Sequence, residues 1–463
     1  MAKVASRWTS CAVVLLTSTL SVPALAQQAD ARRYLTDRAD EDWSFLKDTP
    51  HTDVWDPVKY MPFGNGERFV TLSGEVRYRP EGFRIRSTNT VDNYLLQRYL
   101  FGADIHLGAR TRAFAEVQSG VINGSLRSPR PTDRDSLDLH QGFFEWRQSA
   151  GNGYTLSVKA GRQELSVGSS RLISASPGLN VKRSFDGVAT SFRAPSWTIA
   201  GAVARLVALN QGVFDDGSDP DQLFWGVAAG RRSPWFQGGE FGAYYLGIDR
   251  SLSRYVQGMG AERRHTFGMK WTVTGSRIDW NYDALFQSGD FDGAPIRGWA
   301  FATETGYRVT IRRWLMRASA RADIASGDRD PANPRLEAFN PLFAGNSYSG
   351  AVGLFGPTNL TDFTPGVTMR PRSYLTIGFE APSYWRTSEA DGIYATDLRV
   401  LLPPAAGRGK YVGTNPGVFV NWQATRHWQI QGAITRFLAG AFLEQTFVAS
   451  GFGFYSTTAT YRF

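Results

Sequence analysis

The sequence predicts an all-β protein: a transmembrane, antiparallel, up-and-down β-barrel of about 18 strands in the outer membrane of a Gram-negative bacterium. Three observations predict this fold. Apolar and polar residues alternate with a period of two, connections between candidate strands are alternately long and short, and no segment approaches the ~18 consecutive apolar residues of a membrane-spanning helix. A barrel shows lipid only every second residue, so its average hydropathy resembles that of a soluble protein.

The first 26 residues have the layout of a secretory signal peptide. Lys3 and Arg7 precede an apolar run over 11–20, and the small residues of Ala24-Leu25-Ala26 come just before Gln27. The alternative, an N-terminal membrane anchor, needs a run of ~20 residues, and this one is far shorter. Cleavage after residue 26 also removes the only cysteine, so the exported chain is expected to have no disulfide and no thiol site.

The alternation is clearest over residues 277–287. Apolar side chains occupy one face and polar ones the other, with Leu285 as the one exception. A soluble β-sandwich would give the same alternation, so this pattern alone does not separate the two folds. The apolar face carries Ile278, Trp280, Tyr282, Ala284 and Phe286, and the polar face carries Asp279, Asn281, Asp283 and Gln287.

The spacing of the candidate strands favours the barrel over a soluble all-β fold. Short connections, such as 108–110, 195–196, 275–276, 310–313, 371–372 and 425–427, alternate with long ones, such as 120–137, 162–185, 327–362 and 386–409. Outer-membrane barrels have short periplasmic turns and long extracellular loops, whereas sandwiches give no reason for strict alternation. The strands are expected near residues 69–79, 94–107, 111–119, 138–147, 154–161, 186–194, 197–206, 222–231, 240–250, 264–274, 277–288, 297–309, 314–326, 363–370, 373–385, 410–424, 428–438 and 452–463.

These boundaries divide the exported chain into a periplasmic segment over 27–68 and a barrel over 69–463. The segment is too short for the folded plug of an energised receptor, which favours passive transport. Trp422 and Trp428 flank one turn, as expected of side chains at the lipid headgroups and lipopolysaccharide. The last strand alternates and ends in Phe463, which looks like the signal that the barrel assembly machinery reads.

Seven short segments, in matching order, resemble the alginate export family. They are EDWSFL (41–46), LQRYL (96–100), LDLHQ (137–141), GRQEL (161–165), RSFDG (183–187), SGDRDP (326–331) and FNPLF (339–343). The resemblance implies an 18-stranded outer-membrane barrel that passes an anionic polysaccharide outward through an arginine-rich constriction, gated by an extracellular and a periplasmic loop. Fold-level analogy leaves the cargo open, and an uptake porin for small anionic or aromatic solutes is the alternative.

Strand parity assigns a set of charged residues to the polar, inward face. The expected pore-lining cations are Arg77, Arg98, Arg112, Lys159, Arg193, Lys270, Arg317, Arg321, Arg370 and Arg462, with Arg79 and Arg308 on the same face. The expected pore-lining acids are Asp104, Glu116, Asp279, Asp283 and Asp323, with Glu75, Glu304 and Glu380 alongside. Such an interior suits a water-filled, modestly cationic lumen, but each residue could equally belong to a salt-bridge ladder that stiffens the wall. Arg162 shares the parity of lipid-facing residues and faces inward only if Gly161 opens a bulge.

Other functions are disfavoured by the sequence. A hydrolase would need a nucleophile and a base that converge, whereas Ser136, Asp138 and His140 lie side by side on one strand. The cations do not cluster as in nucleic-acid-binding proteins, so no nucleic acid is expected as a partner. The acidic runs at 215–221 and 290–292 offer oxygen ligands for calcium but are expected to be solvated loops, and no metal or cofactor is predicted.

The long segment 327–362 is expected to fold over or into the pore.

Overall fold

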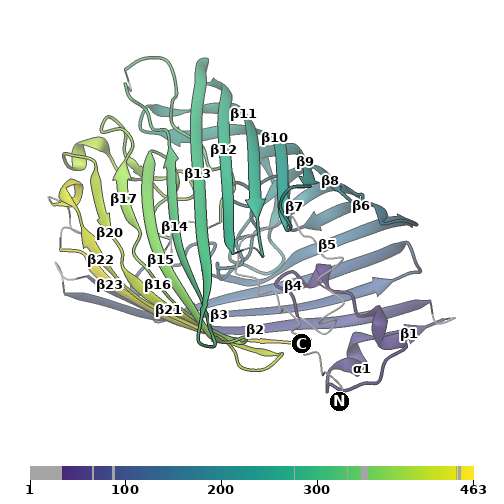
Figure 1. Ribbon diagram of the computed structural model, residues 1–463. Helices are drawn as coiled ribbons and strands as arrows, with labels where there is room; N and C mark the ends of the chain where they lie inside the picture. Colours follow the sequence, from purple (N-terminus) through teal and green to yellow (C-terminus); the bar gives the residue numbers. More distant parts are fainter. Residues whose placement is uncertain are drawn as a thin grey trace.

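The computed structural model describes residues 34–463 apart from 65–66, 86–88, 276, 331, 346–352, 445 and 447–449. These residues form a closed antiparallel barrel of 18 strand positions, in which β2 pairs with both β3 and β23 (Figure 1). The barrel strands are β2 (Arg68–Ile85), β3 (Thr90–His106), β4 (Thr111–Asn123), β5 (Asp135–Ala150), β6 (Tyr154–Gln163), β7 (Phe185–Arg193), β8 (Trp197–Ala208), β9 (Gly217–Arg232), β10 (Gly239–Tyr255), β11 (Gly258–Val273), β12 (Ile278–Phe291), β13 (Ala294–Ile311), β14 (Trp314–Ala325), β15 (Leu360–Arg372), β16 (Leu375–Glu380) with β17 (Ser383–Arg386), β20 (Tyr411–Thr414) with β21 (Gly417–Gln423), β22 (Trp428–Ala439) and β23 (Phe452–Arg462). The fold prediction is confirmed, whereas the expected signal peptide lies outside the described residues.

Two expected strands are each interrupted by a proline. Pro382 separates β16 from β17, and Pro416 separates β20 from β21. Proline has no backbone N–H to donate to the ladder, so a continuous strand breaks there. The two breaks lie beside each other, because the Asn415 amide donates to the Pro382 carbonyl at 2.8 Å. β16 and β17 therefore share one barrel position, and β20 and β21 share the next.

The connections do not alternate in length as strictly as the sequence analysis expected. The strands extend furthest at the end that carries the long loops, and β10–β11 and β12–β13 are joined there by the short turns 256–257 and 292–293. Long loops at the same end are 124–134, 164–184, 326–359 and 387–410, the last of which contains the hairpin β18 (Ile393–Tyr394) and β19 (Val400–Leu402). Short turns face the periplasm in outer-membrane barrels, so we take the long-loop end as extracellular.

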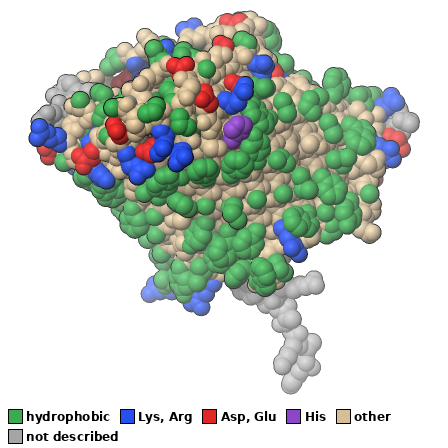
Figure 2. Space-filling view, turned by 90° about the horizontal axis from the view of Figure 1, so that it is seen from above, with side chains coloured by type: hydrophobic (Ala, Val, Ile, Leu, Met, Phe, Trp, Pro, Cys, Tyr) green, Lys and Arg blue, Asp and Glu red, His purple; other side chains and the backbone are tan. Residues whose placement is uncertain are grey.

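The outer surface carries an apolar belt. Figure 2 shows hydrophobic side chains across the middle of one face, with most of the charged groups at its margins. Exposed side chains of the belt include Phe101, Phe144, Val203, Val227, Phe267, Met269, Phe286, Phe301, Phe363, Val367 and Ile434. Exposed rings near the short-turn end include Trp197, Trp235, Trp314, Tyr374, Trp422 and Trp428, as expected at a headgroup boundary. No helix in the described part of the chain is long and apolar enough to cross a membrane.

Two long loops fold into the barrel instead of projecting from it. Loop 164–184 and loop 326–359 contact each other through a bridge between Ile173 and Phe343, and both reach inward-facing residues of the wall. Leu285, the exception to the alternation, is buried against them. This apolar core contains Leu165, Val167, Leu172, Ile173, Phe339, Leu342 and Phe343 from the loops, with Phe185, Phe224, Leu246, Ile248 and Leu285 among the wall residues. The barrel is therefore partly filled by its own chain.

The segment before the barrel packs against the short-turn end (Figure 1). It forms η2 (Arg38–Asp40), η3 (Ser44–Lys47), α1 (Asp56–Lys59) and β1 (Met61–Phe63). Trp55 stacks on the terminal Phe463 ring with centroids 4.0 Å apart, and the indole N–H donates to the Tyr461 hydroxyl at 2.7 Å. β23 pairs with β2 only from Glu75 onward, so the first residues of β2 have no partner there. β1 pairs with residues 68–70 of β2 and covers this free edge.

The topology can be tested by cysteine labelling on intact cells. Ala332 is exposed in the extracellular loop 326–359, and Ser373 is exposed in the turn between β15 and β16. We expect the A332C variant to react with a membrane-impermeant maleimide on intact cells, and the S373C variant to react only after the outer membrane is permeabilised. Labelling of S373C on intact cells would contradict the assigned orientation.

Candidate pore and its inward charges

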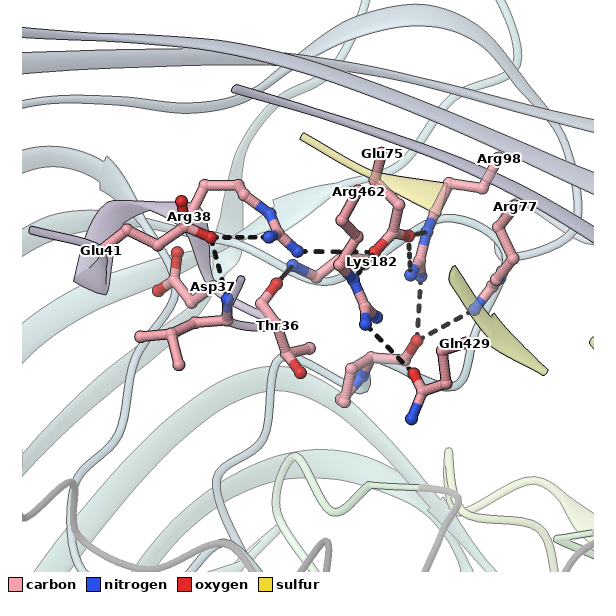
Figure 3. A network of polar contacts seen from close by, with 12 residues as sticks. Thr36, Asp37, Arg38, Glu41, Glu75, Arg77, Arg98, Lys182, Gln429 and Arg462 are labelled. Atoms are coloured by element: carbon pink, nitrogen blue, oxygen red, sulfur yellow. Dashed lines mark hydrogen bonds and ion pairs between the residues drawn. The ribbon is translucent and has the colours of Figure 1, made fainter. Parts of the chain in front are cut away.

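Glu75 on β2 is the centre of a buried polar network (Figure 3). Its side chain is 0% exposed. Arg98 on β3 donates from Nε at 2.8 Å and also from Nη2, Arg462 on β23 donates from Nε at 2.9 Å, and Arg38 of the N-terminal segment lies 3.8 Å away. One carboxylate thus joins the strands that close the barrel to the segment that lies below them.

Arg77 and Arg98 hold the tip of loop 164–184. The Arg77 guanidinium donates to the carbonyls of Pro177 and Leu179 at 3.1 and 2.6 Å, and Arg98 donates to the same two carbonyls at 2.9 Å each. Carbonyl oxygens can satisfy guanidinium donors without neutralising their charge. These two expected pore cations therefore act as anchors for the loop. The charge of Arg98 is also paired with Glu75, whereas Arg77 has no carboxylate within 4.0 Å among the described residues.

A second buried cluster ties the two ends of the same loop together. Glu164 forms an ion pair with Lys182, and His140 Nε2 lies 3.0 Å from the Glu164 carboxylate. Although burial raises the pKa of Glu164, Lys182 and His140 lower it to about 2. His140 also lies 3.9 Å from the expected pore acid Glu116, whereas the Ser136 hydroxyl donates to the Gln211 carbonyl. The serine and histidine of the hydrolase alternative therefore do not converge.

Strands β12, β13 and β14 carry a salt-bridge ladder. Arg317 donates to Asp279 at 2.7 Å and to Glu304 at 2.8 Å, and Arg308 lies 3.1 Å from the same Asp279. Arg308 and Arg317 are directly opposite each other, and Asp279 offsets their repulsion. Gly306 makes the arrangement possible, because a Cβ there would overlap the Arg317 guanidinium as it crosses β13.

Further along β14 the ladder recruits a residue of the inward loop. Arg321 lies 3.5 Å from both Asp323 and Asp362. Arg171 of loop 164–184 lies 3.4 Å from Asp283 and 3.3 Å from Asp323, so that a loop cation pairs with two of the expected pore acids. Arg171 could not be predicted from the alternation, because the alternation assigns faces only to residues on strands.

At the short-turn rim, β3 to β6 form a smaller ladder. Arg112 pairs with Asp104 at 2.7 Å and with Glu145 at 2.6 Å. Lys159 lies 4.0 Å from Asp40 of the N-terminal segment and 4.9 Å from the centre of the Phe143 ring. Most expected pore residues in these ladders are thus neutralised locally.

Three expected pore cations have no carboxylate partner and do not anchor a loop. In the part of the chain that the structure describes, Arg193, Lys270 and Arg370 have no carboxylate within 4.0 Å; Arg77 has none either, but it bonds the carbonyls of loop 164–184. Lys270 is almost fully buried, opposite Asp283, whereas Arg193 and Arg370 are partly exposed. Arg193 is the last residue of β7 and Arg370 lies near the end of β15, so both face the interior at its short-turn mouth.

Arg162 belongs to the outer surface. It keeps the parity of the lipid-facing residues of β6 and forms an ion pair with Asp186, its direct partner on β7, at 2.8 Å. Its next neighbour, Gln163, is buried on the inward face. Gly161 has a positive φ of 130° but no register shift accompanies it, so the bulge that would turn Arg162 inward is not formed.

Sequence reasoning missed several members of these networks. Arg38, Arg171 and Lys182 lie outside regular strands, where a period of two has no meaning. Asp362 lies one residue before the expected strand 363–370, so a wider strand edge could have identified it. Glu145 lies within the expected strand 138–147 and has inward parity, so the alternation was sufficient to identify it.

Comparisons with known proteins agree with this architecture. A family model described as Alginate export matches residues 69–451. Solved structures with a similar fold include the BenF-like porin from Pseudomonas fluorescens Pf-5 (8% identity, TM-score 0.57, covering 85% of this chain and 98% of that one). Two others are from Pseudomonas aeruginosa: OccK11 (OpdR) at 10% identity and TM-score 0.54, covering 87% and 98%, and OccK2 (OpdF) in complex with glucuronate at 10% and 0.55, covering 85% and 97%.

These identities are low, so the likeness to solved structures concerns the fold alone. The chain matches no curated protein sequence. The family match and the porin-like fold together indicate a channel in the outer membrane.

The importance of Glu75 can be tested by its amide isostere. Glu75→Gln leaves the guanidinium groups of Arg98 and Arg462 buried without a carboxylate, which typically costs about 3–5 kcal/mol of unfolding free energy. Glu304→Gln is the matched control: its side chain is 25% exposed and Arg317 retains Asp279, so we expect a loss of about 0–1 kcal/mol. Urea unfolding in detergent micelles measures both, and equal losses would contradict the role assigned to Glu75.

Proposed function

The chain belongs to the alginate export family, and on that premise we propose that this outer-membrane channel passes an anionic polysaccharide, alginate or a similar uronate polymer, by passive transport. The observation that carries the proposal is the pair of partly exposed cations at the short-turn mouth, Arg193 and Arg370, which have no carboxylate within 4.0 Å among the described residues. A polymer made inside the cell would meet this mouth first.

Arginine suits such a cargo for a geometric reason. A guanidinium group offers planar, paired donors that match the carboxylate repeated along a uronate chain. The neighbouring ladder of Arg308, Arg317 and Asp279 presents both signs of charge, which favours entry of an anion and keeps any single contact weak enough for release. No step of this transport requires a cofactor or a metal ion.

An uptake porin for small anionic solutes is the second candidate. The filling of the interior by loops 164–184 and 326–359 favours it, because a narrow passage suits a small solute. A protein of similar fold, OccK2 (OpdF), was solved in complex with glucuronate, which is a single uronate. Both candidates share the recognition of uronate carboxylates, and they differ in the length of chain that passes.

We propose a channel without catalytic activity for either candidate. His140 is fully buried and its Nε2 faces Glu164 and Glu116, so it has no position from which to activate a nucleophile on a substrate in the lumen.

The mouth cations should determine ion selectivity. We expect the wild-type channel in planar bilayers to prefer chloride over potassium, and the R193Q/R370Q variant to have a weaker preference. The difference should grow at low salt, because the Debye length rises from about 10 Å at 0.1 M to about 30 Å at 0.01 M. Reversal potentials in KCl gradients measure this selectivity.

The control for that experiment is R254Q/R263Q, which removes two exposed arginines from the outer surface of β10 and β11. It should retain the wild-type reversal potential. Uronate oligomers should reduce the current of the wild type and of this control, and should reduce that of R193Q/R370Q less. A wild-type channel selective for cations would rule out an anionic cargo of either size.

Loop 164–184 should restrict the current. Arg77→Ala removes donors to the loop tip but takes no partner away from a carboxylate. Arg98 still donates to both carbonyls, so the barrel itself should remain folded. We expect more frequent current fluctuations and a higher mean conductance than in the wild type. Single-channel recordings identical to those of the wild type would show that this loop, or its Arg77 anchor, does not limit flow.

A further inference from the structure

Three aspartates that are separated in the sequence come together at the extracellular end of the barrel. Asp135 and Asp138 lie on β5, and Asp216 ends the loop 209–216 between β8 and β9. One carboxylate oxygen from each lies within 4.8 Å of the other two. The acidic run 215–221 was expected to be a solvated loop, but residues 217–221 belong to β9, and Asp216 lies beside two residues of β5.

A β-bulge places both β5 carboxylates on the same side. Residues three apart on a regular strand point to opposite faces. Here Asp138 is opposite Gln118 and Asp135 is opposite Gly120, so β5 contains one more residue than β4 between these pairs. Bulges re-aim side chains in this way, and they are features that a sequence retains for a purpose.

Loop 209–216 completes the cluster from the other side. Leu137 forms a parallel bridge with Val213, and the Asp216 amide donates to Asp138 Oδ1 at 3.2 Å. The Asp216 carboxylate accepts from the Asn210 amide at 2.6 Å. The loop is thereby docked on the edge of β5 above the point where β6 ends, with Asp216 partly open to solvent.

The buried carboxylates have no cation beside them in the described part of the chain. Asp135 is 0% exposed and Asp138 is 1% exposed. Both oxygens of Asp135 and Oδ2 of Asp138 lack a hydrogen-bond partner, and no cation of the described chain lies within 4.0 Å of any of the three aspartates. The nearby Arg162 is occupied by Asp186. Leaving such oxygens unpaired is costly, so they call for a ligand that is itself positively charged.

We propose that Asp135, Asp138 and Asp216 bind one calcium ion, which ties loop 209–216 to β5 at the cell surface. Calcium takes oxygen ligands at 2.3–2.6 Å, so two of its ligands can lie up to about 5 Å apart. Magnesium at about 2.1 Å allows only about 4 Å, and it demands near-octahedral geometry. Water reaching the cluster past Asp216 would complete the coordination.

The test is calcium binding to the full barrel, refolded in detergent and freed of metal by chelation. We expect calorimetric titration with calcium chloride at pH 7.5 to give one site per chain, with a dissociation constant on the order of 10⁻⁴–10⁻³ M or tighter, as in other extracellular sites. Magnesium chloride should bind at least about tenfold more weakly. Calcium should also raise the temperature at which the wild-type barrel unfolds.

The variant D135N/D138N should lose the binding heat and the calcium-dependent rise in unfolding temperature. Without calcium this variant should unfold at the wild-type temperature or above, because the substitutions relieve repulsion between carboxylates. Such an unfolding temperature would also show that the variant is folded. The control D290N/D292N changes the same number of charges in the acidic turn 292–293 and the end of β12, and should bind calcium like the wild type. Absence of calcium binding in the wild type, equal affinity for magnesium, or undiminished binding in D135N/D138N would each overturn the proposal.

Discussion

The burial of the Glu75 carboxylate among guanidinium groups is the interaction on which the rest of the structure depends. A closed barrel must join its first strand to its last, and Glu75 on β2 lies directly opposite Arg462 on β23 where that happens. Its second partner, Arg98, is also an anchor for loop 164–184, and Arg38 connects it to the N-terminal segment. Barrel closure, the loop in the lumen and the segment at the periplasmic end are thus coupled through one carboxylate.

The same physics governs the remaining charges of the interior. A barrel wall turns its polar side chains inward, and loops that fold into the lumen exclude water from them, so an unpaired charge becomes expensive. Most inward arginines accordingly face carboxylates or carbonyls. Under the proposed function, the charges available to a solute are those at the short-turn mouth, where the side chains of Arg193 and Arg370 are partly exposed. Such an interior would be rigid along one wall and would attract anions at its entrance.

The sequence predicted all 18 barrel positions because a period of two is a local signal, written into each strand. The Pro382 and Pro416 breaks were local signals as well, and they were overlooked. The alternation predicts which face of the wall a charged residue occupies, but it does not predict its ion-pair partner. Asp283, for example, pairs with Arg171, which lies in a loop more than a hundred residues away in the sequence. The bulge that turns Asp135 and Asp138 to one side depends on pairing with β4, which no local pattern contains.

We propose that the interior passes a uronate chain because of the charge of that chain. The most direct measurement is the flux of uronate oligomers of increasing length into proteoliposomes, compared with neutral oligosaccharides of the same length. We expect uronates to pass faster than neutral sugars at every length that enters, and oligomers of several residues to pass as well. Equal or faster passage of the neutral sugars would contradict it, and passage of single uronates alone would leave uptake of small solutes as the function.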